Sequence, residues 1–184
     1  MIHPVIETVV RRMGECGLHF ASPPLVIGGM AMEYYGLRKS GADIDLVISA
    51  GDYDRLAAAY PDARKDIYGD MGVVIAEFEI WRSIALLDYA FLKEDAVDCG
   101  DVLMVSPDRL LLMRVCAMEV EKYRRDLELV KNWYYEHHRN PAFLAEAETH
   151  IPDYEKYHGV ILGGAYEASR HDNTGTGKET KPAE

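Results

Sequence analysis

The sequence reads Leu25-Val26-Ile27-Gly28-Gly29-Met30 and, after a short spacer, Asp43-Ile44-Asp45-Leu46-Val47-Ile48. Successive side chains on a strand point to opposite faces, so we expect Asp43 and Asp45 to project together while their apolar neighbours enter the core. Neighbouring carboxylates repel each other unless a cation lies between them, and such oxygen ligands suit Mg²⁺ or Mn²⁺ better than Zn²⁺. Glycines allow the backbone to approach a phosphate closely. The two motifs together predict a phosphate cradle beside a metal site.

This combination resembles the DNA polymerase beta-like nucleotidyltransferase superfamily, in which Gly-Gly or Gly-Ser precedes a helix and then an Asp-apolar-Asp strand. Bacterial members have segments similar to Ser106-Pro107-Asp108-Arg109-Leu110-Leu111 and Lys122-Tyr123-Arg124-Arg125-Asp126-Leu127, so the resemblance covers roughly residues 25 to 132. It implies an α+β nucleotidyltransferase fold, with a small mixed β-sheet flanked by helices and a helical C-terminal part. It also implies transfer of a nucleoside monophosphate from an NTP to a hydroxyl, with pyrophosphate leaving.

The resemblance assigns roles to individual residues. Asp43 and Asp45 would hold the metal, together with a third acid on a later strand. Glu79, in Phe78-Glu79-Ile80, fits that third position best, while Asp88, in Leu87-Asp88-Tyr89, fits nearly as well and Glu77 is a further candidate. For each of these three acids, the alternative interpretation is an exposed strand residue.

Phosphate contacts are expected from four residues. Gly28 and Gly29 would cradle the triphosphate, and Arg38 and Ser40, just before Asp43, would reach the phosphates that leave as pyrophosphate. Arginine suits this role because its planar guanidinium binds phosphate oxygens with two hydrogen bonds. The alternative for Arg38 is a solvated loop position.

The expected cofactor is Mg²⁺ or Mn²⁺, the expected substrate is an NTP, and the acceptor is tRNA, a protein or a small molecule. Stand-alone bacterial relatives include the enzymatic halves of toxin–antitoxin and abortive-infection systems and antibiotic-modifying enzymes. We favour the toxin–antitoxin type, which implies a cognate antitoxin as partner. The alternative function is a non-catalytic nucleotide-binding or protein-interaction module that keeps the fold.

Composition limits the remaining possibilities. A chain of 184 residues with 48% hydrophobic residues can bury one full core. A net charge of -11 argues against broad binding of nucleic acid, which needs basic residues to neutralise phosphates. There is no apolar run of about 18 residues and no signal pattern at Met1-Ile2-His3-Pro4, so we expect a cytoplasmic protein without a membrane partner.

Three parts are expected along the chain: an α/β core over 1–105, a helical part over 106–167 and a disordered tail over 168–184. Patterns of apolar residues and helix-breaking residues predict the individual elements. The predicted helices cover 3–17, 30–35, 52–60, 107–118, 122–137, 141–148 and 154–157, and the predicted strands cover 25–27, 43–48, 64–68, 73–81 and 84–92.

Overall fold

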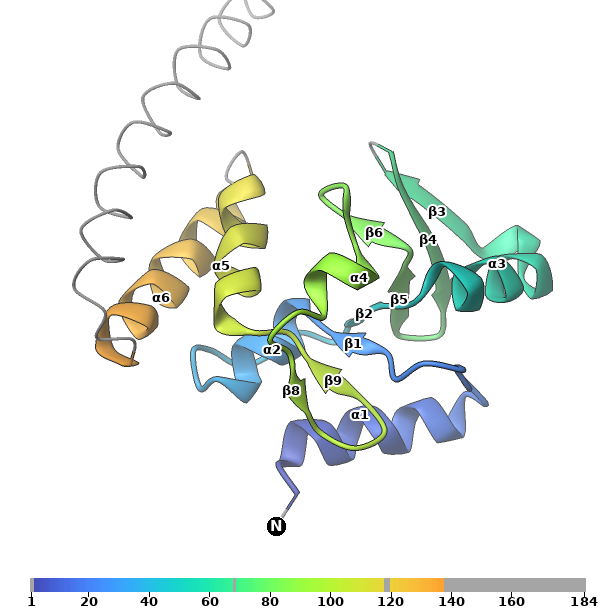
Figure 1. Ribbon diagram of the computed structural model, residues 1–184, viewed down its shortest axis with the longest axis horizontal. Coiled ribbons are helices and arrows are strands. Elements are labelled where there is room, and N and C mark those ends of the chain that lie inside the picture. The colour runs from blue at the N-terminus through green and yellow to red at the C-terminus, as the bar shows by residue number, and fades with distance from the viewer. Residues whose placement is uncertain (1, 68, 118–119, 138–184) are drawn as a thin grey trace, which may run out of the picture. The chain divides into compact units, whose positions relative to one another are not determined.

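The computed structural model describes residues 2–67, 69–117 and 120–137, and a seven-stranded mixed sheet lies at its centre (Figure 1). The strand order is β3-β4-β5-β2-β1-β9-β8, with β2 parallel to β5 and β1 parallel to β9. The strands of this sheet are β1 (Leu25–Val26), β2 (Ile44–Val47), β3 (Arg64–Ile67), β4 (Asp70–Ile75), β5 (Phe78–Trp81), β8 (Val97–Asp98) and β9 (Leu103–Met104). A separate antiparallel hairpin consists of β6 (Ser83–Ile84) and β7 (Leu87–Asp88).

Among the described residues, four helices alternate with the strands along the chain, and two more follow the last strand. They are α1 (Pro4–Glu15), α2 (Gly28–Tyr34), α3 (Ala50–Ala59), the short α4 (Tyr89–Leu92), α5 (Pro107–Cys116) and α6 (Glu121–His137), with one 3₁₀ turn, η1 (Pro61–Ala63). The helix starts follow capping chemistry: Ser106 accepts a hydrogen bond from the Arg109 N–H, and Pro107 occupies the first turn of α5.

Strands β2 and β5 bury one face completely, and on the other face Val47 and Trp81 are also buried while Asp45 and Glu79 are half-buried. Ile44, Leu46, Phe78 and Ile80 are at most 2% exposed and belong to the main core. The residues that alternate with them therefore lie on the opposite face of the sheet. This alternation decides where the acidic side chains of the two strands project.

The helical C-terminal part is joined to the core by an ion pair over a long sequence separation. Asp126 on α6 accepts hydrogen bonds from Arg38 Nε at 2.6 Å and from a terminal Arg38 nitrogen at 2.8 Å. Tyr35 also contacts the Trp133 ring, with 5.2 Å between centroids. In Figure 1, α5 and α6 lie side by side as an antiparallel pair.

The expected α+β class, with a mixed sheet, flanking helices and a helical C-terminal part, is confirmed. Within the described ranges, no helix combines the length and the apolar character needed to cross a membrane. The predicted helices at 141–148 and 154–157 and the tail at 168–184 lie outside the described residues.

Two predicted strands were wrong. The stretch 73–81 is not one strand, because a turn at Ala76, with φ of 52°, and Glu77 separates β4 from β5. The stretch 84–92 forms the end of a hairpin and then α4. The buried Asp70 carboxylate accepts hydrogen bonds from the N–H groups of Ala85 and Leu86, and these bonds hold both residues in the left-handed turn.

Candidate active site

Asp45 and Glu79 lie side by side on neighbouring parallel strands. The register pairs Asp45 with Glu79, between the pairs Ile44 with Phe78 and Leu46 with Ile80. Residues opposite each other in a ladder share a face of the sheet, so both carboxylates project from the face opposite the core. We call Asp45 and Glu79 the acid pair.

Gly28 packs directly against the Asp45 carboxylate. It has a φ of +61°, and a Cβ added to it would lie 2.0 Å from Asp45 Oδ2. The next residue, Gly29, faces the loop before β2, where an added Cβ would lie 3.5 Å from the Gly41 nitrogen. The two glycines therefore lie at the first turn of α2, with Gly28 against Asp45 and Gly29 against the loop before β2.

The surroundings of Asp45 disfavour its charge. Burial raises the Asp45 pKa, the negative charge of Glu79 raises it further, and Arg114 and Lys122 partly oppose the shift. The Trp81 indole N–H also favours the Asp45 carboxylate, although no hydrogen bond joins the two groups and no other acceptor for it occurs among the described residues. A half-buried carboxylate next to a like charge is an arrangement that a cation would stabilise.

Glu79 already contacts one cation of the protein. Lys65 Nζ on β3 lies 2.6 Å from Glu79 Oε1, and it lies 5.8 Å from the centroid of the Trp81 ring. The sequence analysis did not select Lys65 or Trp81. Glu79, the partner of Lys65, lies 14 positions away in the sequence. Lys65 could therefore have been identified only once β3, β4 and β5 were known to be neighbours in the sheet.

The expected phosphate contacts of Arg38 and Ser40 are occupied by protein groups. Arg38 binds both oxygens of Asp126. The N–H and hydroxyl of Ser40 both donate to Glu33, at 2.8 Å and 2.7 Å. Lys39 and Ser40 together lower the Glu33 pKa to about 2. Either residue would have to exchange a protein partner for a phosphate.

The other acids have different surroundings. Asp43 is exposed and directly precedes β2. Asp88 is exposed in the separate hairpin, where it caps α4 by accepting a hydrogen bond from the Phe91 N–H at 2.9 Å. Glu77 lies in the β4–β5 turn and forms an ion pair with Arg12 of α1, which lowers the Glu77 pKa. Of the three candidates for the third acid, Glu79 is the one paired with Asp45 in the sheet.

The donor set suits a hard divalent cation in part. No three His, Cys, Asp or Glu side chains among the described residues stand together as a complete set of ligands. Mg²⁺, however, commonly takes one or two carboxylates and completes its shell with water and substrate phosphates. The acid pair, with Asp43 two positions before Asp45, supplies carboxylates of that kind.

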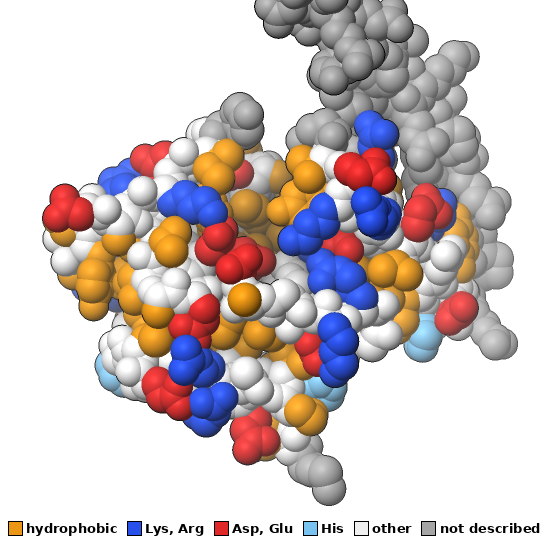
Figure 2. Space-filling view, turned by 180° about the vertical axis from the view of Figure 1, so that it is seen from behind, with side chains coloured by type: hydrophobic (Ala, Val, Ile, Leu, Met, Phe, Trp, Pro, Cys, Tyr) orange, Lys and Arg blue, Asp and Glu red, His pale blue; other side chains and the backbone are white. Residues whose placement is uncertain are grey.

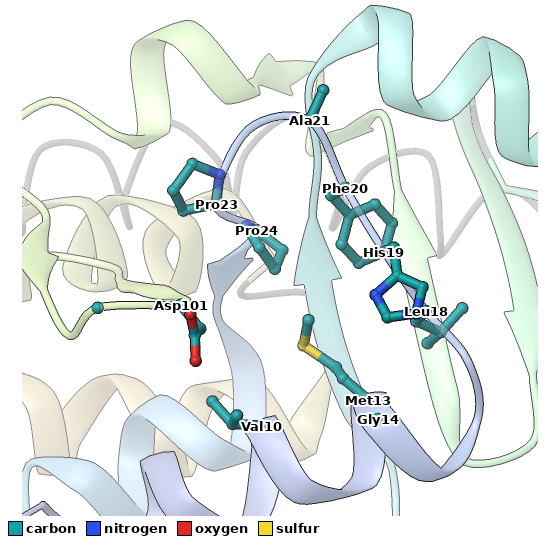
Figure 3. A pocket seen from close by; sticks show the side chains of 11 residues that line it. Val10, Met13, Gly14, Leu18, His19, Phe20, Ala21, Pro23, Pro24 and Asp101 are labelled. Atoms are coloured by element: carbon teal, nitrogen blue, oxygen red, sulfur yellow. The ribbon is translucent and has the colours of Figure 1, made fainter.

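Charged side chains gather on one face of the molecule, and a pocket lies apart from the candidate residues. Figure 2 shows acidic side chains near the middle of one face, with basic side chains on both sides of them. A pocket of about 470 Å³ lies between the end of α1, the loop at 18–24 and the β8–β9 turn (Figure 3). Its lining is mostly apolar, with His19 and Asp101 as its polar side chains, and it includes none of the candidate residues.

No family model matches the chain, and no curated protein or solved structure is similar enough to count as a match.

Proposed function

We propose that this protein is a divalent-metal-dependent nucleotidyltransferase of the DNA polymerase beta-like superfamily, which transfers a nucleoside monophosphate from an NTP to a hydroxyl. The main support is the in-register placement of Asp45 beside Glu79, with Gly28 packed against the Asp45 carboxylate. This arrangement places adjacent carboxylates at the first turn of α2, whose two glycines carry no side chain.

Each residue has a defined role in this proposal. Asp45 and Glu79, with Asp43, hold Mg²⁺ or Mn²⁺, which when bound would stabilise the charge that develops on the phosphoryl group. The backbone of Gly28 and Gly29 lies alongside the triphosphate. The acceptor oxygen forms a bond to the α-phosphorus, the bond from that phosphorus to the bridging oxygen breaks, and pyrophosphate and a proton are released.

Asp88 provides a matched control in a test of this function. Transfer from each α-labelled NTP, with Mg²⁺ or Mn²⁺, is measured to a pool of tRNA, cell proteins and an aminoglycoside. We expect Asp45→Asn and Glu79→Gln to abolish transfer, whereas Asp88→Asn removes a charge but keeps a helix-capping side chain, and should keep transfer. Full transfer by Asp45→Asn, or loss with Asp88→Asn but not with Glu79→Gln, would contradict the assignment.

The acceptor class is part of the same proposal. We propose the toxin–antitoxin type, with tRNA or a protein hydroxyl as acceptor and an antitoxin as partner, and the labelled product identifies which class is correct. A label on the aminoglycoside alone would favour the antibiotic-modifying type.

A second function is supported by a specific observation. Arg38, Ser40 and Glu79 are all held by other side chains of the protein, which favours a non-catalytic module that keeps the fold. Such a module would bind an NTP without transfer, or bind none. Equilibrium binding of the NTP beside the transfer assay distinguishes it from the enzyme.

A further inference from the structure

Lys65 reaches across a strand to the acid pair. It lies on β3, at the edge of the sheet, and its ammonium contacts Glu79 on β5, so the side chain passes over β4. The Lys65 side chain is 37% exposed and the Glu79 side chain is 23% exposed. The contact is therefore neither fully solvated nor sealed from water.

Gly72 on β4 makes this reach possible. It is opposite Lys65 on one side and opposite Trp81 on the other. A Cβ on Gly72 would lie 2.7 Å from the Trp81 ring and from the Lys65 carbonyl oxygen. The Trp81 ring therefore lies over the glycine, and the Lys65 ammonium stays 5.8 Å from its centroid. Because Gly72 has no side chain, the Lys65 side chain and the Trp81 ring can both lie over β4, and the Lys65 ammonium reaches Glu79 on β5.

The charges around the two carboxylates are unequally distributed. Arg114 acts on Asp45 from the helical part, where it also faces Asp126 at 3.4 Å. Among the described residues, Lys65 is the cation that forms an ion pair with Glu79. A divalent ion bound at Glu79 would meet the positive charge of Lys65 within a few ångströms, and like charges at that distance repel strongly.

We propose that Lys65 is the resident counter-ion of Glu79 and competes with the divalent cation, so that it sets the metal concentration at which the site fills. This inference rests on the proposed function, because it takes Glu79 as a metal ligand. The ammonium neutralises Glu79 in the metal-free protein and must leave, or tolerate repulsion, when a dication binds.

Direct metal binding tests the proposal without any transfer assay. Free Mn²⁺ is counted by electron paramagnetic resonance during titration of the full chain as wild type, Lys65→Met, Lys65→Gln and Lys65→Arg. We expect Lys65→Met and Lys65→Gln to tighten Mn²⁺ binding by about five- to tenfold, as removal of a half-buried ion-pair partner implies, and Lys65→Arg to leave it unchanged. Thermal unfolding confirms that each variant is folded.

Arg64→Met is the matched control, because Arg64 is the adjacent cation on β3 but pairs with Asp66 at 2.8 Å. It should leave Mn²⁺ affinity unchanged. Equal or weaker binding by both Lys65→Met and Lys65→Gln overturns the counter-ion role. Unchanged binding in Asp45→Asn overturns the metal site itself, and the Lys65 inference with it. If the Lys65 variants bind Mn²⁺ more tightly but the wild type transfers no label, the proposed enzymatic function is wrong and the counter-ion role of Lys65 is retained.

Discussion

Replacing Gly28 by alanine tests the central contact of the candidate site. The new Cβ would lie 2.0 Å from Asp45 Oδ2, 2.8 Å from its Cγ and 3.0 Å from its Cβ, so the carboxylate must move. The left-handed backbone adds a cost of about 1 kcal/mol for any residue with a Cβ. Displacing a packed side chain adds about 1–3 kcal/mol. We therefore expect Gly28→Ala to lower the free energy of unfolding by about 2–4 kcal/mol.

Gly36→Ala isolates the contact from the backbone cost. Gly36 follows α2 with a φ of +72°, and an added Cβ would meet nothing within 4 Å. We expect it to cost about 1 kcal/mol, from backbone strain alone. The assay is urea unfolding, in which the extra loss in Gly28→Ala should lower the midpoint by about 1 M relative to Gly36→Ala.

The same glycine substitution in an Asp45→Ala variant tests whether the Asp45 carboxylate causes the cost. In Asp45→Ala the two closest atoms are absent, and the nearest remaining atom is the Cβ at 3.0 Å. The cost of Gly28→Ala should then fall toward that of Gly36→Ala. An equal cost of the two glycine substitutions in the wild type, or an undiminished cost of Gly28→Ala in the Asp45→Ala background, would refute the contact.

Three further substitutions test the electrostatics by urea unfolding. Since burial and Glu79 raise the folded-state pKa of Asp45, the contribution of Asp45 to stability falls as pH rises above about 4. Asp45→Asn should therefore be more stable than the wild type at pH 7 but not at pH 3, and no gain at pH 7 argues against the burial. The Glu33 pKa is lowered to about 2, so its contribution is complete above about pH 4.5 and disappears toward pH 2. Glu33→Gln should cost about 1 kcal/mol at pH 7 and flatten that acid dependence, and an unchanged acid profile contradicts this. Asp126→Ala leaves Arg38 and the buried Arg114 without their carboxylate and should cost about 3–5 kcal/mol, whereas a cost below about 1 kcal/mol would mean that water replaces it.

Local sequence rules were sufficient for elements with a strong pattern. The apolar spacing of α1 and the Ser106-Pro107 start of α5 predicted both helices within a few residues. The alternation in Asp43-Ile44-Asp45-Leu46 predicted both the strand and the face on which Asp45 projects. These features depend on neighbours along the chain, and a single sequence contains that information.

The remaining features depend on partners that are distant in sequence. Nothing near Ala76 and Glu77 marks a turn, since no glycine, proline or asparagine occurs there, and the turn became evident only from the structure. The assignment of Arg38 to a phosphate could not anticipate Asp126, which lies 88 positions away. For the same reason, the pairing of Glu79 with Asp45 needed the sheet order, while the sequence alone left Asp88 as a comparable candidate.

The distribution of unsatisfied groups favours a functional interpretation of Asp45. Elsewhere the buried carboxylates are well satisfied: Asp52 and Asp70 each accept several hydrogen bonds, and Asp126 binds Arg38. Among the described residues, four buried side-chain atoms lack a hydrogen-bond partner, and one of them is the indole nitrogen of Trp81, which acts on Asp45. Stable folds seldom leave a buried donor unpaired beside two adjacent carboxylates, because such a group costs about 1–3 kcal/mol. A bound cation and phosphate oxygens would neutralise the carboxylates and supply the missing acceptors, so the features that cost stability at Asp45 are those that ligand binding would compensate.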